Sequence, residues 1–375
     1  MKICILTQPL ITNYGGLLQA FALQTVLKRE GHEVWTEDRR LNPQNIKIYC
    51  KEIFKRGLGF IPFQQRFSNA PSITETQMLY VRKNTDLFIK KYITITEPIF
   101  STDKTQLKKY GFDAYIVGSD QVWRPRYSQG IENYFLDFIK GQSVRRIAYA
   151  ASFGTDLWEF SSRQTRTCAA LAKLFDLITV REDSGIALCQ EHLGVKAEQV
   201  LDPTMLLEKA DYEALIKAEK EPQSPGNLFC YILDENQKKQ EVIQKVAETC
   251  NLNPFKVMPK LPLNTKNVHE HLEDCVFPRV TQWLRAFMDA EIVITDSFHG
   301  CVFSIIFNKP FWVIGNKERG LARFNSLLSM FNLQSRLINL HDKMVDWSLP
   351  IDWELVNSLK NDLRVKSLYF LNKNL

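Results

Sequence analysis

Long apolar segments are missing from this sequence. No run approaches the ~18 consecutive apolar residues that a membrane-spanning helix requires. The opening segment MKICILTQPL becomes polar too early for a secretory signal peptide. We therefore expect a cytoplasmic protein, with peripheral contact at the inner face of the membrane as an alternative.

Paired cysteines and several catalytic motifs are missing as well. The eight cysteines are scattered and form no CxxC pair, so neither a zinc site nor a disulfide framework is predicted. The chain lacks GxGxxG, GxxxxGK[ST], GxSxG and HExxH, which argues against a dinucleotide site, a P-loop, a serine hydrolase and a zinc protease. We predict metal-independent chemistry on an anionic donor, without a cofactor.

The composition is that of an ordinary globular protein, with 45% hydrophobic and 24% charged residues. A length of 375 residues exceeds what one core usually organises. The net charge of +6 comes from interspersed residues, 48 Lys and Arg against 42 Asp and Glu. This balance suits an anionic small molecule or an anionic membrane surface, and nucleic acid is not expected. A merely basic protein is the alternative.

Segments typical of strands and helices alternate along the whole chain, which favours an α/β fold with parallel sheets. The polar, proline-containing segment EKEPQSPGN, residues 219–227, is typical of a linker. We therefore predict two Rossmann-like domains that face each other across a cleft. The first covers residues 1–218, with an insertion at about 40–110, and the second covers 219–375 and ends in a helix.

Charged residues follow apolar runs at two places, LITVREDSG (177–185) and IVITDSFHG (292–300). The carboxyl ends of parallel strands line the ligand crevice in open α/β sheets. At such an end Arg181 can hold a carboxylate or phosphate. An internal salt bridge to a neighbouring carboxylate such as Asp202 is the alternative.

His299 stands at the start of a predicted helix, directly after Asp296 and Ser297, which we include as substrate-binding candidates. Small effects move the pKa of a histidine across neutrality, which suits acid or base catalysis. A core histidine with a satisfied hydrogen bond is the alternative.

The segment NYGGLLQA places Asn13, Gly15 and Gly16 at a helix start directly after a strand. Free backbone N–H groups and the helix dipole make such a turn a good anion site. A turn that needs glycine only for its backbone geometry is the alternative.

The segment VGSDQVWRPR contributes three further candidates. Ser119 allows a close approach of the backbone, Asp120 can serve as acceptor or base, and Trp123 can form a flat wall against a sugar ring. A helix N-cap is the alternative role for Asp120.

The segment GNKERGLARFNSLL supplies a basic loop after a predicted strand. Lys317, Arg319 and Arg323 are candidates for a phosphate clamp. A solvated basic face is the alternative.

Seven blocks of the sequence resemble, in order and approximate spacing, the polysaccharide pyruvyl transferase family. They are NYGGLLQAFALQ, DAYIVGSDQVW, RIAYAASFG, TVRE, VLDPTMLL, DSFHGCVFSIIFNKPF and RGLARFNSLL, and the resemblance covers residues 1 to about 340. It implies the two-domain arrangement of GT-B glycosyltransferases. It also implies transfer of a pyruvyl group from phosphoenolpyruvate to a sugar of a surface or exopolysaccharide precursor, usually as a ketal across two hydroxyls, with release of phosphate.

The resemblance also implies roles for individual residues. The family's functional arginine after a strand corresponds to Arg181, and the histidine of its D-x-x-H block corresponds to His299. In better-studied members an arginine stands two places before that histidine, where this chain has Ser297. We expect His299 to act as acid or base, Arg181 to bind the donor anion, and Asp120 to orient or deprotonate an acceptor hydroxyl.

Two other functions are compatible with the same architecture. One is a GT-B-type glycosyltransferase that uses a nucleotide sugar, and the other is a non-catalytic sugar-binding relative, which Ser297 suggests. The segment NIKIYCKEIFKRGLGFIPFQQRF, residues 45–67, interleaves aromatic and aliphatic residues with Lys and Arg. It predicts either contact with a membrane surface that holds a lipid-linked acceptor, or ordinary packing of an insertion.

Overall fold

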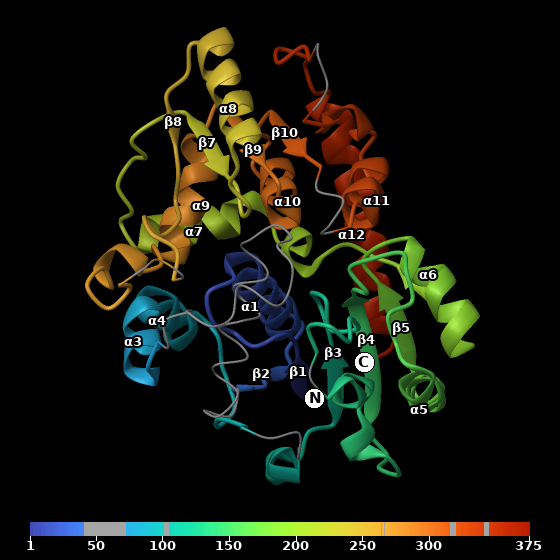
Figure 1. Ribbon diagram of the computed structural model, residues 1–375. Helices are drawn as coiled ribbons and strands as arrows, with labels where there is room; N and C mark the ends of the chain where they lie inside the picture. The colour runs from blue at the N-terminus through green and yellow to red at the C-terminus, as the bar shows by residue number, and fades with distance from the viewer. Residues whose placement is uncertain are drawn as a thin grey trace.

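The computed structural model describes residues 1–40, 73–100, 105–128, 130–263, 265, 267–315, 320–340 and 345–375. Within these residues the chain forms two parallel sheets with helices packed around them (Figure 1). The predicted α/β class is therefore confirmed. Segment 45–67, Lys317 and Arg319 lie outside the described residues, and the predictions made for them stay predictions.

The first sheet has the strand order β2-β1-β3-β4-β5-β6, and all of its neighbouring strands pair in parallel. Its strands are β1 (Lys2–Leu6), β2 (Glu33–Thr36), β3 (Ala114–Val117), β4 (Arg145–Ala151), β5 (Leu177–Val180) and β6 (Glu198–Gln199). Apolar runs such as AYIV in β3 are buried at every position, because helices cover both faces of a parallel sheet. The strand order reverses between β1 and β3, which is the place where such sheets bind ligands.

The helices of this part often begin with a local capping signal. They are α1 (Tyr14–Arg29), α3 (Glu75–Val81), α4 (Lys83–Tyr92), α5 (Ser162–Ala172), α6 (Ser184–Leu188) and α7 (Lys209–Ala218), with shorter helical turns η1 (Thr105–Tyr110), η2 (Ile131–Phe135), η3 (Asp137–Ile139), η4 (Cys189–Leu193) and η5 (Pro203–Leu206). In α5, Ser161 accepts from the backbone N–H of Gln164, whose side chain binds back to the N-cap.

The second sheet has the order β11-β10-β9-β7-β8 and is also parallel throughout. Its strands are β7 (Leu228–Tyr231), β8 (Pro254–Phe255), β9 (Ile292–Thr295), β10 (Phe311–Ile314) and β11 (Leu337–Ile338). The accompanying helices are α8 (Gln237–Cys250), α9 (Val280–Asp289), α10 (Phe298–Ile306), α11 (Ala322–Met330) and α12 (Trp353–Lys373), with turns η6 (Glu273–Cys275) and η8 (Gln334–Arg336). None of the described helices is both long and apolar enough to cross a membrane.

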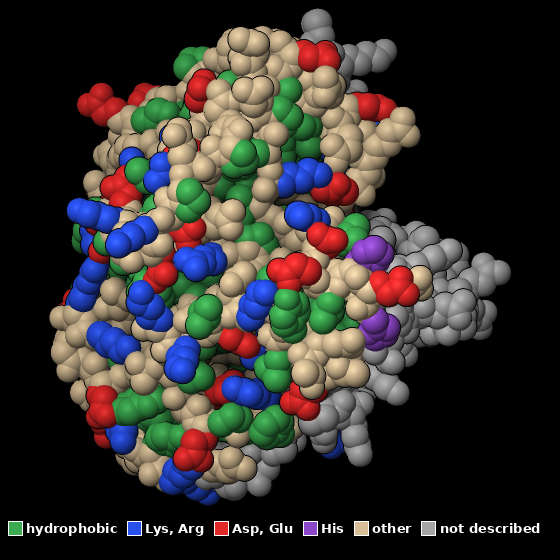
Figure 2. All heavy atoms as spheres, turned by 90° about the vertical axis from the view of Figure 1, so that its left-hand side faces the viewer, with side chains coloured by type: hydrophobic (Ala, Val, Ile, Leu, Met, Phe, Trp, Pro, Cys, Tyr) green, Lys and Arg blue, Asp and Glu red, His purple; other side chains and the backbone are tan. Residues whose placement is uncertain are grey.

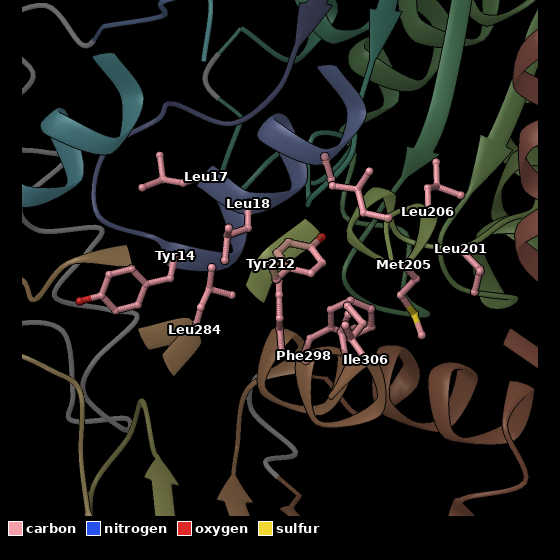
Figure 3. Close-up of a cluster of buried hydrophobic side chains, with 14 of the residues drawn as sticks. Tyr14, Leu17, Leu18, Leu201, Met205, Leu206, Tyr212, Leu284, Phe298 and Ile306 are labelled. Atoms are coloured by element: carbon pink, nitrogen blue, oxygen red, sulfur yellow. The ribbon is translucent and has the colours of Figure 1, made fainter. Parts of the chain in front are cut away.

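Apolar side chains from both sheets' helices form one continuous core between the two halves (Figure 3). Tyr14 of α1 stacks on Trp283 of α9 with ring centroids 5.6 Å apart, and its hydroxyl donates to the Pro278 carbonyl. Tyr212 of α7 meets Phe303 of α10 edge-to-face. The predicted cleft is therefore filled by apolar packing along this side.

Two segments brace the halves further. The last helix, α12, returns to the first sheet, where the Ser367 hydroxyl accepts from the Leu201 N–H and Arg364 donates to the Leu206 carbonyl (Figure 1). On another side, the Phe277 N–H donates to the carbonyl of Val81, at the end of α3. Rigid-body opening of the two halves would have to break these contacts.

Charged side chains of both signs lie among one another on the face that Figure 2 shows. This agrees with the interspersed pattern of charges in the sequence. On this face the Lys and Arg side chains do not gather into one continuous basic stripe of the kind that follows a nucleic-acid backbone.

The stacked aromatic contact between the halves predicts the effect of one substitution. Trp283→Ala should lower the free energy of unfolding by about 3–5 kcal/mol, because the fully buried indole packs against rings from both halves. Denaturant unfolding measures this loss. Val365→Ala serves as the control, since its side chain is 68% exposed and should change stability by less than about 0.5 kcal/mol. Equal losses in the two variants would contradict the packing described.

Candidate functional site

Polar and charged side chains from both halves meet at the carboxyl ends of the first sheet. We call this group the junction cluster: Ser119 and Asp120 after β3, Arg181 and Glu182 after β5, Asp202 after β6, His299 in α10 and Arg323 in α11. Arg181 and Glu182 are 1% exposed and His299 is 6% exposed. The charged side chains that follow the strands are therefore buried in the interior of the protein.

Asp202 lies at the centre of the junction cluster. Its Oδ1 accepts from the backbone N–H and the hydroxyl of Thr204, at 3.0 and 2.7 Å. Its Oδ2 accepts from Arg181 Nη1 at 2.9 Å and from the Ser119 hydroxyl at 3.4 Å, and lies 3.6 Å from His299 Nε2. Burial opposes ionisation, but His299, Arg181 and the Thr204 N–H outweigh it and hold the Asp202 pKa well below its usual value. Asp202 is therefore a carboxylate at neutral pH.

Arg181 forms the internal salt bridge that the sequence left as an alternative to donor binding. Its Nη2 is also 3.7 Å from Asp120 Oδ1, and its Nε is 4.0 Å from Glu182 Oε2. Burial tends to lower the Arg181 pKa, but Asp202, Asp120 and Glu182 outweigh it and raise the pKa. The protein itself therefore compensates this positive charge. Arg181 Nε and Nη2 nevertheless lack hydrogen-bond partners.

Arg323 is in the opposite electrostatic situation. Its guanidinium carbon lies 5.9 Å from the centre of the Phe298 ring, and the guanidinium carbon of Arg181 lies 4.2 Å from the centre of the same ring. Burial, together with the neighbouring positive charge of Arg181, lowers the pKa of Arg323 to about 10. Arg323 Nε is buried without a hydrogen-bond partner. Glu182 and Asp120 offset these effects only in part, so an anion placed here would further stabilise the positive charge.

The N-termini of α1 and α10 converge on His299. The N-cap residues Asn13 and Ser297 make no side-chain capping hydrogen bond, and Asn13 instead donates to Asp120 at 3.3 Å. A Cβ built on Gly15 would stand 2.1 Å from both Cγ and Nδ1 of His299, so only glycine lets α1 approach the ring this closely. Two helix dipoles therefore add positive potential at the site.

Trp123 does not belong to the site, which corrects the expectation that it lines a sugar pocket. Its side chain is fully buried, stacks on Phe135 at 4.8 Å and donates its Nε1–H to the Tyr134 carbonyl. The sequence pattern could not reveal this, because the stacking partner Phe135 and the Tyr134 carbonyl both come from the separate turn η2.

Asp296 is likewise held inside the second half rather than aimed at a ligand, which corrects its predicted substrate-binding role. Its carboxylate accepts from the Leu233 and Asp234 N–H groups and from Lys239 Nζ at 2.6 Å. It thus joins the loop after β7 to α8. The neighbouring Ser297 donates its N–H to the Thr295 hydroxyl oxygen.

Sequence reasoning placed neither Asp202 nor Glu182 in the site. Glu182 Oε1 accepts from the Ser152 hydroxyl and from the N–H groups of Phe153 and Gly154, which fixes the loop after β4. The available signal was their position directly after predicted strands, within two blocks of the family resemblance.

A small surface pocket lies away from the junction cluster. Its volume is about 70 Å³, far below the several hundred Å³ of usual ligand sites. It is lined by Leu10, Ile11, Asp38, Arg39, Arg40, Glu75, Met78, Leu79, Arg82 and Phe100. Among the described residues, no group of three or more His, Cys, Asp or Glu is arranged to hold a metal ion.

The family model for polysaccharide pyruvyl transferases matches residues 13–318. The chain belongs to this family. The match contains each described member of the junction cluster except Arg323, which lies just beyond it. Comparison with curated protein sequences finds no match.

Solved structures with a similar outline include a UDP-GlcNAc 2-epimerase from Neisseria meningitidis, at 11% identity, with 100% of this chain and 94% of that chain covered and a TM-score of 0.45. The UDP-GlcNAc 2-epimerase of Methanocaldococcus jannaschii shows 12% identity, 98% and 100% coverage and a TM-score of 0.45. Arabidopsis thaliana UGT89C1 with UDP-L-rhamnose shows 10% identity, 99% and 96% coverage and a TM-score of 0.48. No conclusion about function rests on these low values.

The close approach of α1 to His299 predicts a difference between two adjacent glycines. Gly15→Ala should lower the free energy of unfolding by about 1–3 kcal/mol, because the added methyl overlaps the imidazole. Gly16→Ala is the matched control, since its nearest neighbour is the movable, exposed side chain of Asn13 at 3.1 Å. Denaturant unfolding of both variants measures the difference. Equal stability of the two variants would contradict the contact.

Proposed function

We propose that this chain transfers a pyruvyl group from phosphoenolpyruvate to a sugar of a surface polysaccharide precursor and releases phosphate. The family match supports a polysaccharide pyruvyl transferase. The donor phosphoenolpyruvate and the sugar acceptor are our proposal, and a lipid-linked sugar is one alternative for the acceptor. The observation that carries it is the under-compensated Arg323 beside two uncapped helix N-termini, which together suit a phosphate.

The donor carries a carboxylate and a phosphate, so it needs positive charge at two places. Arg323 and the N-termini of α1 and α10 suit the phosphate, while Nε and Nη2 of Arg181, which lack hydrogen-bond partners, suit the carboxylate. The proposal includes no metal ion and no cofactor, because these groups already supply positive charge. Arg323 also takes over from the arginine that the family has where this chain has Ser297.

The reaction begins when an acid gives a proton to the methylene carbon of the donor, which leaves a cationic carbon bonded to the phosphate oxygen. A sugar hydroxyl attacks this carbon and loses its proton. The bond between carbon and phosphate oxygen then breaks, and a second hydroxyl attacks to close the ketal, while its proton leaves with the phosphate. We propose His299 as the acid, because it is the histidine that the junction cluster encloses.

Asp120 is the candidate for the acceptor side. Its backbone is in the left-handed region, with φ of 71°, and its carboxylate contacts Asn13 and Arg181. This places an anionic oxygen at the point where the first sheet's strand order reverses. A sugar hydroxyl that reaches this point would be oriented by Asp120.

Sugar-dependent phosphate release from phosphoenolpyruvate tests the proposal directly. We expect release with at least one lipid-linked or nucleotide sugar, and a loss of about 10²-fold or more in His299→Ala. His32→Ala is the matched control, because His32 precedes β2 at the opposite end of the sheet. Absence of release over a broad acceptor panel would count against the proposal. Protection from thermal unfolding by UDP or GDP, without protection by phosphoenolpyruvate, would favour a glycosyltransferase instead.

The role given to Arg323 is tested by Michaelis kinetics. Arg323→Gln should raise KM for phosphoenolpyruvate by about 10–100-fold, the usual effect of a lost charged hydrogen bond. Arg279→Gln is the matched control, since that side chain is 52% exposed on the surface. Adding Ser297→Arg to Arg323→Gln should recover part of the affinity. An unchanged KM in Arg323→Gln would show that the donor is held elsewhere.

A further inference from the structure

The two ring nitrogens of His299 have different surroundings. Nε2 lies 3.6 Å from Asp202 Oδ2 and is fully buried without a hydrogen-bond partner. Among the described residues, Nδ1 of His299 is not one of the buried atoms that lack a hydrogen-bond partner. The Cβ position built on Gly15 is 2.1 Å from Cγ and Nδ1 and 2.7 Å from Cε1, which places it over the ring face rather than beyond its edge. Gly15 therefore lies over the ring face and not on the in-plane direction of Nδ1.

The groups that face His299 act differently on its two nitrogens. Asp202 presents an anionic oxygen to Nε2, and Arg181 donates to the same oxygen from the side. The N-termini of α1 and α10 add positive potential near the ring. An unprotonated Nε2 would direct its lone pair at a carboxylate, whereas an Nε2–H would give that carboxylate a donor.

We propose that Asp202 is a positioning residue that keeps a proton on Nε2, so that His299 reacts through Nδ1. The second half of this inference rests on the proposed function. In that reaction the imidazolium gives its Nδ1 proton to the methylene carbon of the donor. The attacking sugar hydroxyl then loses its proton to Nδ1, which restores the imidazolium, while Nε2–H stays directed at Asp202 throughout.

The position of the proton can be read without any substrate. Long-range ¹H–¹⁵N correlation spectra of protein labelled with ¹⁵N-histidine distinguish the two neutral forms of the ring. The chain has six histidines, and the signal absent from His299→Gln assigns residue 299. We expect the Nε2–H form to be preferred by about tenfold or more in the wild type, because the anionic Oδ2 of Asp202 lies 3.6 Å from Nε2 and attracts a proton there.

Asp202→Asn should reduce this preference severalfold, because the anionic acceptor is removed. Asp211→Asn is the matched control: Asp211 is also an ion-paired carboxylate, but it binds Arg29 on α1 and makes no contact with His299. It should leave the ratio of the two forms unchanged. A predominant Nδ1–H form in the wild type would overturn the proposal, and this result needs no variant. The same ratio in wild type and folded Asp202→Asn would overturn it as well.

The outcome of this experiment and the outcome of the phosphate-release assay can be told apart. If phosphoenolpyruvate is not turned over but Nε2–H predominates, the proposed donor is wrong and the positioning by Asp202 stands. If the donor is turned over while Nδ1–H predominates, the proposed function stands and the role of Asp202 is wrong.

Discussion

The buried carboxylate of Asp202 is the interaction on which the site depends. A carboxylate removed from water must find cations and hydrogen-bond donors, and this one finds them after β3, after β5, in η5 and in α10. Residues from both halves of the chain are therefore fixed around one carboxylate group. Removing one partner of such a buried pair is costly, because the remaining charge is left uncompensated.

The apolar interface makes this electrostatic arrangement possible. Tyr14, Trp283 and Tyr212 belong to a core that continues from one half to the other, and it brings α1 against α10. Most residues of the junction cluster are buried as a consequence, and charges interact more strongly there than they would at the surface. Apolar packing determines where the halves meet, and the charges determine the specific contacts at that place.

Arg181 and Arg323 have the same type of side chain but different electrostatic surroundings. Three carboxylates surround Arg181 and raise its pKa, so its charge serves the architecture of the site. Arg323 has Arg181 as a neighbour and its pKa is lowered, so its positive charge is less well compensated than that of Arg181.

Local sequence patterns were sufficient for the parallel α/β class, the alternation of elements and the start of α10 near His299. These features depend on apolar periodicity and on backbone geometry, which act over a few residues. The burial of Trp123, the attachment of Asp296 to Lys239 and the central place of Asp202 were decided only by tertiary structure. Which charges meet depends on strand order and on the packing of the two halves, and neither is encoded in the spacing along the chain.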